Sequence, residues 1–518
     1  MFGFLVLAHL ILAKAWIGQH LILRYNNSHG YVTAIAAVFR NMVDSHAGFL
    51  HGVVTCQFAQ DVGEYWPSLV HRTYLLGLLC LSYKWMFLIN FVYLIVIMLG
   101  IYFTVRFLIG DRFYSLLAAA LFSCYGVIGM QLISCELQLA GMASIVWGFY
   151  WYIRSAFFTR LWPVVFFTVC VILAFYCERV TMGLYLGALF FVPQNFKNRR
   201  SVLVMALAGL VVLASIWPFY YHWFMMRDWS SGLVEFFDIA GDQLGVVASY
   251  KMILNNPTFV GMHILYYFLC LPEMLLGRGF TFLLLVGFWF LRGWKDGWRS
   301  VLLFALFVPL AGFILIAKKH YLFIIPLCVY FSMITAIGIF SISRQSVRNL
   351  LVGLALVLCA VYSFNTYSSG RPLEKVLFSG SFPFIKTLGV PKLFSWDCFG
   401  VADYKRVREM AESIRPFLYP LSGSRKVLMV DLKEYVQQHT LVYLLQLTLE
   451  KIAVVNVRFS DHVDPGQWLQ DADGYLLSDK MKYSDALAAK DIGGCAYRGV
   501  EPVFNLSGSE VVLYKVRR

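Results

Sequence analysis

Hydrophobic residues fill long, nearly continuous stretches of the first two thirds of the chain, separated by short polar segments. A helix needs about 20 apolar residues to cross the hydrocarbon core of a bilayer. We predict a transmembrane helix in each of eleven stretches, near 1–23, 86–105, 113–132, 138–157, 161–176, 180–193, 201–222, 272–291, 300–317, 320–340 and 349–366. The apolar stretch 258–271 lies between Pro257 and Pro272, which favour a separate short element, either a twelfth span or an interfacial helix.

The distribution of Lys and Arg predicts the orientation of these helices. Cytoplasmic loops of membrane proteins carry an excess of both residues. With a cytoplasmic N-terminus, five short cytoplasmic connections are all basic, through Arg106 and Arg112; Arg154 and Arg160; Lys197, Arg199 and Arg200; Arg292, Lys295 and Arg299; and Arg344 and Arg348. The longer polar segments 24–85 and 224–257, and the chain after about 367, then lie outside.

The composition supports a membrane protein and excludes other classes. Charged residues make up 14% of the chain and hydrophobic residues 60%, with a mean hydropathy of +0.68. About a quarter of the residues of an average soluble domain are charged. A soluble enzyme, a disordered protein and a coiled coil are therefore excluded. The net charge of +14 is explained by basic cytoplasmic loops, so we expect no nucleic-acid partner.

The chain becomes polar and mixed near residue 367. Its pattern there predicts strands at 426–432, 453–459 and 511–516 and a helix over 434–452. We therefore predict two domains. Residues 1–366 form a multispan transmembrane domain with outer loops 24–85 and 224–271, and residues 367–518 form a small extracytoplasmic α/β domain. The predicted fold class is a polytopic α-helical membrane protein with about 11 transmembrane helices and this α/β domain.

Ionisable residues gather at the predicted outer ends of the helices. A carboxylate can accept a proton from a hydroxyl, and cations can stabilise charge on a departing phosphate. Together they suit a reaction that activates a hydroxyl and expels a phosphate. The carboxylates are Asp44, Asp61 and Glu64 in the first outer loop and Glu136 in a short outer turn. The cations are Arg179, Lys318 and Lys319 in two further outer turns.

Simpler explanations exist for most of these residues. Asp61 and Glu64 are also explained as solvated loop residues, and the three cations as anchors that reach lipid headgroups. Glu136 is a stronger candidate because it lies between two apolar spans, where a charge is costly. The four histidines of the first outer loop fit no standard ligand spacing. We therefore predict no cofactor, with a divalent metal ion as the open alternative.

Three motifs resemble those of membrane glycosyltransferases with the GT-C fold, in the same order along roughly residues 1–345. This superfamily includes protein O-mannosyltransferases and the lipid A aminoarabinose transferase. Glu64-Tyr65-Trp66-Pro67-Ser68-Leu69 resembles its "YPPL" segment. Asn255-Asn256-Pro257 through Leu271-Pro272 resembles its loop and "LP" helix start. Lys318-Lys319-His320-Tyr321 with Pro326 resembles its "K-x-x-Y-x-x-P" segment. An external C-terminal domain is also usual in these enzymes.

The resemblance implies roles for individual residues. A carboxylate of the first outer loop is the usual catalytic residue, but the family's "D-E-x-x-Y" aligns with Asn27-Ser28-His29-Gly30-Tyr31, and an amide cannot act as a base. Either Asp44, Asp61 or Glu64 substitutes, or the alignment is shifted, or the enzyme is inactive. The family's second acidic residue maps onto Glu136. Carrier-phosphate contacts are implied for Arg179, Lys318, Lys319 and Tyr321.

We therefore predict a membrane glycosyltransferase, a hexosyl- or pentosyltransferase. It moves a sugar from a polyprenyl-phosphate carrier to a lipid, glycan or protein hydroxyl by direct displacement. We expect it in the bacterial inner membrane, in contact with membrane lipids and with its active site outside. Three alternatives stay open: a polymerase or ligase of lipid-linked glycans, which uses a diphosphate-linked donor; a transporter or flippase; and an inactive scaffold.

Overall fold

The computed structural model describes residues 3, 6–12, 83–132, 138–177, 180–225, 265–294, 297–315, 324–369, 412–414, 425–431, 452–456, 472–479, 499–505 and 511–517. The chain divides into two compact units. One contains residues 6–12 and the helices from Phe87 to the last transmembrane helix, and the other contains the strands of the C-terminal part.

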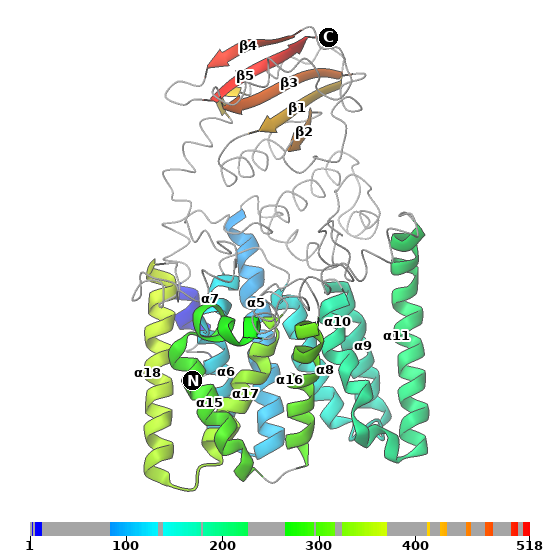
Figure 1. Cartoon of the computed structure of the whole chain (residues 1–518), viewed down its shortest axis with the longest axis vertical. Helices are drawn as coiled ribbons and strands as arrows, with labels where there is room; N and C mark the ends of the chain where they lie inside the picture. Colours follow the sequence, from blue (N-terminus) through cyan, green and yellow to red (C-terminus); the bar gives the residue numbers. More distant parts are fainter. Residues whose placement is uncertain are drawn as a thin grey trace, which may run out of the picture. The chain divides into compact units, whose positions relative to one another are not determined.

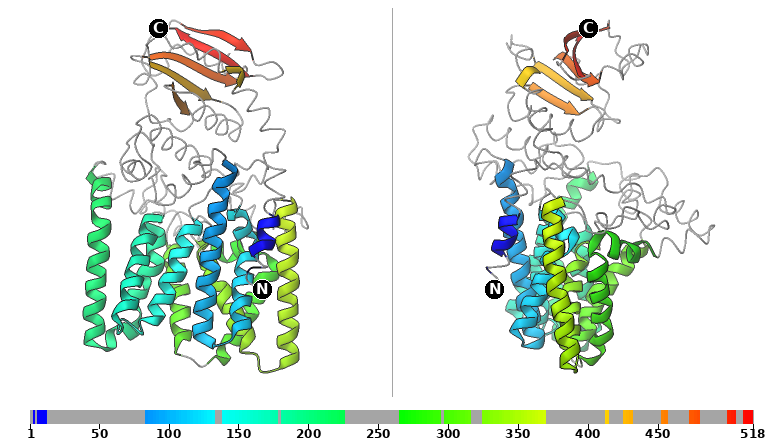
Figure 2. Two further views of the ribbon diagram at one scale, coloured as in Figure 1. Left: turned by 180° about the vertical axis from the view of Figure 1, so that it is seen from behind. Right: turned by 90° about the vertical axis from the view of Figure 1, so that its left-hand side faces the viewer.

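Long apolar helices stand side by side in the first unit (Figure 1). The α-helices are α5 (Tyr83–Ile109), α6 (Arg112–Cys124), α7 (Gly126–Leu132), α8 (Gln138–Arg154), α9 (Leu161–Cys177), α10 (Val180–Gly187), α11 (Arg199–Met225), α15 (Arg278–Phe290), α16 (Trp298–Leu315), α17 (Leu327–Phe340) and α18 (Gln345–Ser369). The shorter elements are η2 (Ala188–Phe191), η3 (Pro193–Lys197), η4 (Leu271–Leu275) and η5 (Leu291–Gly293). Helices α11 and α18 stand at opposite edges of this unit in Figure 1 and in the left view of Figure 2.

Helices lie within the predicted spans that the structure describes, although the span predicted over 180–193 is α-helical only as far as Gly187. Three of them are long and apolar enough to cross a membrane by themselves, over Ile89–Ile109, Arg199–Trp217 and Gln345–Asn365. Four shorter apolar helices, α6, α9, α16 and α17, lie inside predicted spans. The chain is therefore an integral membrane protein.

Two other predicted spans differ from the structure in detail. The span predicted over 113–132 is two helices, because Tyr125 has an extended backbone with ψ 135° and separates α6 from α7. The span predicted from 272 begins at Arg278 instead. Pro272 lies in η4, a π-helical turn, and Gly277 adopts a φ of 92° before α15 starts. A positive φ of this kind suits glycine, which has no Cβ to clash.

Helix α17 forms the core of the first unit. All its residues from Leu327 to Ile339 are buried. Its closest neighbour is α15, where the two backbones meet at glycines: a Cβ added to Gly338 would overlap the carbonyl group of Gly287. A Cβ on Gly287 would in turn lie 2.7 Å from the Cα of Thr335. Small residues at such crossings let helix backbones approach closely in membranes.

The basic connections all lie at one end of this unit, the lower end in Figure 1. Of the Arg and Lys residues named above for these connections, all but Lys295 are described, and Asp111 is the one acidic residue among the described residues there. Side chains link the connections to one another. The Arg154 guanidinium lies 5.4 Å from the centre of the Phe107 ring, and the Phe157 and Trp298 rings stack 4.8 Å apart. The predicted alternation of helix ends is thus confirmed, whereas the side of the membrane on which this basic end lies stays a prediction.

The turn between α8 and α9 has an unusual backbone. Three consecutive non-glycine residues, Ala156, Phe157 and Phe158, have φ of 48°, 62° and 65°. The left-handed region costs an L-residue roughly 1–2 kcal/mol. The turn is held by Ser155, whose Oγ donates to the carbonyl of Tyr152 at 2.6 Å and accepts from the Phe158 N–H at 3.1 Å.

The second unit contains a mixed five-stranded sheet in the order β2-β1-β3-β5-β4. Its strands are β1 (Arg425–Asp431), β2 (Ile452–Asn456), β3 (Ala472–Asp479), β4 (Gly499–Asn505) and β5 (Val511–Arg517). Strand β1 pairs in parallel with β2 and β3, and β5 pairs antiparallel with β3 and β4.

The predicted strands at 426–432, 453–459 and 511–516 are confirmed as β1, β2 and β5. Strands β3 and β4 were not predicted from the sequence. Pro502 lies in β4 beside a register shift, and β4 is an edge strand, where a missing N–H is tolerated. The predicted helix over 434–452 lies outside the described residues, apart from Ile452, which begins β2. The predicted domain boundary near 367 also stays a prediction.

We expect the Gly338→Ala variant to be clearly destabilised, because its Cβ forces α15 and α17 apart. Overpacking of this kind costs about 1–3 kcal/mol. Thermal unfolding in detergent measures the effect. The matched control is Gly353→Ala in α18, where an added Cβ meets nothing within 4 Å, so its stability should equal or slightly exceed that of the parent protein. Equal unfolding temperatures for both variants would contradict the proposed role of the glycine contact.

Candidate functional site

The predicted site residues lie outside the described residues. These are Asp44, Asp61, Glu64, Glu136, Arg179, Lys318, Lys319 and Tyr321, together with Asn27 at the family's Asp position. The structure does describe the helix ends that flank three of the segments concerned. These ends are Leu132 and Gln138 around Glu136, Cys177 and Val180 around Arg179, and Leu315 and Ile324 around the two lysines.

Asn90 of α5 fixes the helix end that precedes Glu136. Its side chain is completely buried, and its Nδ2 donates to the carbonyl oxygens of Gln131 and Leu132, both at 3.2 Å. The last carbonyl groups of a helix have no partner within that helix. Asn90 therefore supplies a partner for the end of α7 and ties this helix end to α5.

Neutral amide side chains surround the α7–α8 corner. Asn90, Gln131 and Gln138 are all buried, with exposed fractions of 4% or less. Gln131 is the penultimate residue of α7 and Gln138 the first of α8, so the two flank the segment that carries Glu136. Buried polar groups are costly in a membrane and mark functional regions by default. We refer to Asn90, Gln131 and Gln138 as the amide cluster.

Helix α8 contacts both helix ends that flank Arg179 in the chain, the end of α9 and the start of α10. A Cβ on Gly141 would lie 2.8 Å from the sulfur of Met182, so α8 and α10 are in close contact there. One turn further along α8, the Ser144 hydroxyl lies 3.9 Å from the thiol of Cys177, the last residue of α9. The start of α8, the end of α9 and the start of α10 are therefore neighbours at the end of the unit opposite the basic connections (Figure 1).

A second buried polar group holds the N-terminal segment. His9 is 4% exposed, and its Nε2 lies 3.1 Å from the Ser123 hydroxyl of α6. Beside it, the Ser363 hydroxyl of α18 donates to the Cys124 thiol at 3.2 Å. These contacts connect His9 to α6, and α6 to α18. They explain how polar side chains in three apolar segments are satisfied, as the interior of a membrane protein requires.

Candidate metal ligands are scarce in the described part of the chain. No group of three or more His, Cys, Asp or Glu side chains there can hold a metal ion. The four histidines of the first outer loop, His29, His46, His51 and His71, lie outside the described residues.

The sequence interpretation missed the amide cluster and His9. Their signal was present as single polar residues inside apolar stretches, such as Asn90 within Phe87-Leu88-Ile89-Asn90-Phe91. The amides carry no charge, and His9 lies within a predicted span, so ionisable residues at helix ends do not point to either.

Comparison with solved structures identifies the fold. The chain matches the crystal structure of ArnT from Cupriavidus metallidurans bound to undecaprenyl phosphate with a TM-score of 0.59 and 12% sequence identity, covering 99% of this chain and 98% of ArnT. The apo state of the same protein matches with a TM-score of 0.55 and 13% identity, covering 98% and 97%. The predicted GT-C fold is thus confirmed over nearly the full length. No protein-family model and no curated protein matches the sequence.

We expect the Asn90→Leu variant to lose about 1–3 kcal/mol of stability, because two buried carbonyl groups lose a donor. Chemical or thermal unfolding in detergent measures this loss. Thr104→Val is the matched control in the same helix, since the buried Thr104 hydroxyl has no hydrogen-bond partner among the described residues. A loss no larger than that of the control would show that Asn90 does not hold the α7–α8 corner.

Proposed function

We propose that this protein is a membrane glycosyltransferase that uses a polyprenyl-phosphate-linked sugar. It transfers the sugar to a lipid, glycan or protein hydroxyl at the end of the helical unit opposite the basic connections. That end faces the outside of the cell, and the membrane is the bacterial inner membrane.

The observation that carries this proposal is the fold match to ArnT. It extends over nearly the whole of both chains, and ArnT was crystallised with undecaprenyl phosphate. A carrier lipid of this class presents its phosphate at the membrane surface and its apolar chain to the bilayer. A substrate of that shape suits a protein whose apolar helices end in polar segments.

Glu136 is our first candidate for the base that accepts the acceptor's proton. The capped end of α7 supports this role, because Asn90 restrains the chain shortly before Glu136 and Gln138 begins α8 shortly after it. A general base must be held within hydrogen-bond reach of the proton that it removes. The first-loop carboxylates Asp44, Asp61 and Glu64 are the alternative bases.

Arg179 is our first candidate for binding the departing phosphate. The packing of Gly141 against Met182 and of Ser144 against Cys177 supports this assignment, since it brings the helix ends beside Arg179 close to α8. Lys318, Lys319 and Tyr321 are further candidates, between the end of α16 at Leu315 and the start of α17 at Leu327. The carrier phosphate gains negative charge as the sugar leaves, and fixed cations stabilise that charge.

The proposed step is a single displacement at the anomeric carbon. The base takes the proton from the acceptor hydroxyl, and the hydroxyl oxygen bonds to the anomeric carbon. The bond from that carbon to the phosphate oxygen breaks, and its electrons leave with the carrier phosphate.

We expect the Glu136→Gln variant to lose transfer activity by at least 100-fold, because an amide cannot accept the proton. The assay uses the full-length protein in liposomes, a panel of radiolabelled polyprenyl-phosphate sugars and a membrane extract as the acceptor source. The matched control is Glu178→Gln, which makes the same chemical change at the residue before Arg179, in another predicted outer turn. Its activity should stay within about twofold of the parent protein.

The outcomes separate the alternatives. Unchanged transfer by Glu136→Gln would remove this residue from the mechanism and redirect the search to Asp44, Asp61 and Glu64. Transfer only from diphosphate-linked oligosaccharides would replace the proposal by a lipid-linked glycan polymerase or ligase. Absence of transfer from every donor by a folded protein would contradict an enzymatic function.

A further inference from the structure

The corner between α10 and α11 is a rigid part of the basic end. Asn195 of η3 is completely buried and holds this corner together. Its Oδ1 accepts from the Tyr152 hydroxyl at 2.9 Å, and its Nδ2 donates to the carbonyls of Leu189 at 2.8 Å and Phe190 at 3.1 Å. The start of α11 is capped by Asn198, whose Oδ1 accepts from the Arg200 N–H at 2.9 Å.

This corner carries the highest local density of cations among the described connections. Lys197, Arg199 and Arg200 lie within four residues of one another, and all three are exposed. None of the three forms an ion pair with another residue in the part of the chain that the structure describes. Asn195 and Asn198 satisfy backbone groups there but contribute no negative charge. We define the α11 corner as Lys197, Arg199 and Arg200 with the neighbouring Phe191 and Phe196.

Three unpaired cations in this position repel one another. They also stand at the amino end of α11, where the helix dipole disfavours positive side chains. An anion bound near these cations would reduce both penalties. The charge arrangement therefore favours a bound anion over solvent alone.

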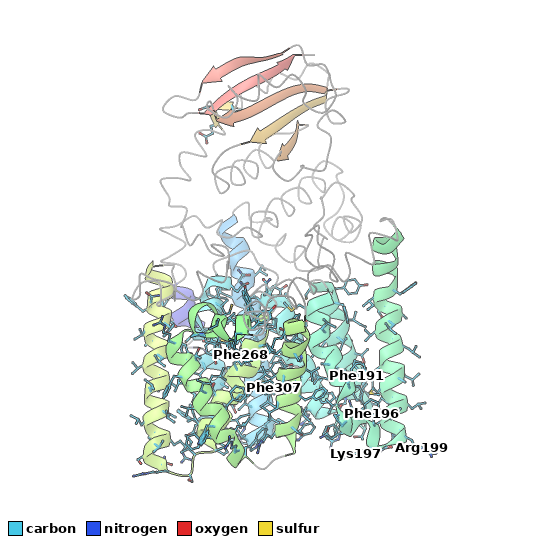
Figure 3. All side chains as sticks on the ribbon, viewed as in Figure 1. Phe191, Phe196, Lys197, Arg199, Phe268 and Phe307 are labelled. Atoms are coloured by element: carbon cyan, nitrogen blue, oxygen red, sulfur yellow. The ribbon has the colours of Figure 1, made fainter. Side chains whose placement is uncertain are left out.

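Apolar groups adjoin the cations. Phe191 is 71% exposed and Phe196 is 53% exposed. In Figure 3, Phe196 lies just above Lys197 and Arg199, and Phe191 lies further from the cations, toward the middle of the helical unit. From the corner, an exposed stripe runs along α11 through Leu203, Leu207, Leu210 and Trp217. These residues are three, four or seven positions apart, so they share one face of the helix.

This face of α11 is left uncovered by the other helices that the structure describes. The spanning part of α11, Arg199–Trp217, has 17% of its residues buried, compared with 44% for the spanning part of α5. The buried side of α11 instead packs on α9 and η3. A cationic group at the membrane surface thus continues directly into an apolar helix face within the bilayer.

We propose that the α11 corner binds an anionic phospholipid. Lys197, Arg199 and Arg200 hold the headgroup phosphate, Phe196 lies at the level of the glycerol backbone, and an acyl chain follows the exposed stripe of α11. The charge and the adjoining apolar stripe together select this occupant. A second copy of the chain is a poor occupant of this corner. A two-fold dimer interface pairs a surface patch with itself, so the cations of one copy would face and repel the cations of the other. This site lies at the end of the unit opposite the proposed active site and does not depend on the proposed function.

The test compares two triple variants of the full-length protein. The first is Lys197→Gln/Arg199→Gln/Arg200→Gln. The second is Arg112→Gln/Arg160→Gln/Arg344→Gln, which removes the same charge from three exposed positions spread over other basic connections. Native mass spectrometry of each detergent-purified protein, titrated with phosphatidylglycerol or with phosphatidylcholine, gives the affinity of individual bound lipids. Thermal unfolding confirms that each variant is folded.

We expect the parent protein to bind phosphatidylglycerol more tightly than phosphatidylcholine. The first triple variant should lose about 10- to 100-fold in phosphatidylglycerol affinity, because three basic contacts to an anionic headgroup are removed. The second triple variant should stay within about twofold of the parent protein, and phosphatidylcholine binding should be equal in all three proteins.

Three results would overturn the proposal. An equal loss in both variants would mean that binding is a diffuse effect of net charge. Equal affinity for the two lipids would mean that the corner does not select a negative headgroup. Displacement of phosphatidylglycerol by millimolar inorganic phosphate, or a loss confined to added undecaprenyl phosphate, would assign the corner to a different anion.

Discussion

The close contact between the backbones of α15 and α17 constrains the rest of the helical unit. Apolar helices gain little from the hydrophobic effect against one another in lipid, because lipid tails are as apolar as their side chains. Close packing must supply the attraction instead. Gly287 and Gly338 allow the two backbones to meet, and α17 is then buried along its whole length from Leu327 to Ile339. Helix α6 packs on the same core, where the Tyr114 and Phe340 rings lie 5.3 Å apart. Movement of α17 would therefore disturb several neighbours at once.

The two ends of this unit are chemically different. One end carries exposed cations and is joined by aromatic contacts, as between Phe157 and Trp298. The other end has buried neutral amides, with Asn90 binding the carbonyl end of α7. Cations at a membrane surface need only water or lipid headgroups as partners, whereas buried amides need specific partners in the protein. Asn90 thus fixes a helix end here, as Asn195 does at the basic end, and a helix end held in this way is the kind of support that a catalytic site requires.

Much of the fold was predictable from sequence because spanning helices leave a strong signal. Twenty apolar residues and basic connections identify a helix and its direction without knowledge of its neighbours. Breaks within a span were not predictable in this way. Tyr125 and Gly277 interrupt apolar stretches through their backbone conformations. The mean hydropathy of a stretch carries no information about backbone conformation. In the sheet, β1 and β5 contain clear apolar runs. Strand β4 contains Pro502, which argues against a strand in the sequence and is tolerated there because β4 lies at the edge of the sheet.

The location of the candidate site stays a prediction, whereas the structure describes residues that support the neighbouring helix ends. Charged residues at helix ends point to the end of a unit, and they directed attention to Glu136 and Arg179. The residues that hold the neighbouring helix ends are neutral or small. Asn90 and Gly141 have no distinguishing chemistry in the sequence, and their importance arises from what they touch, a carbonyl pair in one case and the Met182 side chain in the other.

The left-handed turn at Ala156–Phe158 has a consequence for the opposite end of the molecule. Helices α8 and α9 are each 17 residues long and run antiparallel from this turn. Each residue of helix adds 1.5 Å of length and about 100° of rotation. The length and conformation of the turn therefore set the register between the first residue of α8 and the last residue of α9. A one-residue insertion at Phe157 would change the relation between Gln138 and Cys177, although it lies a full helix length away from both.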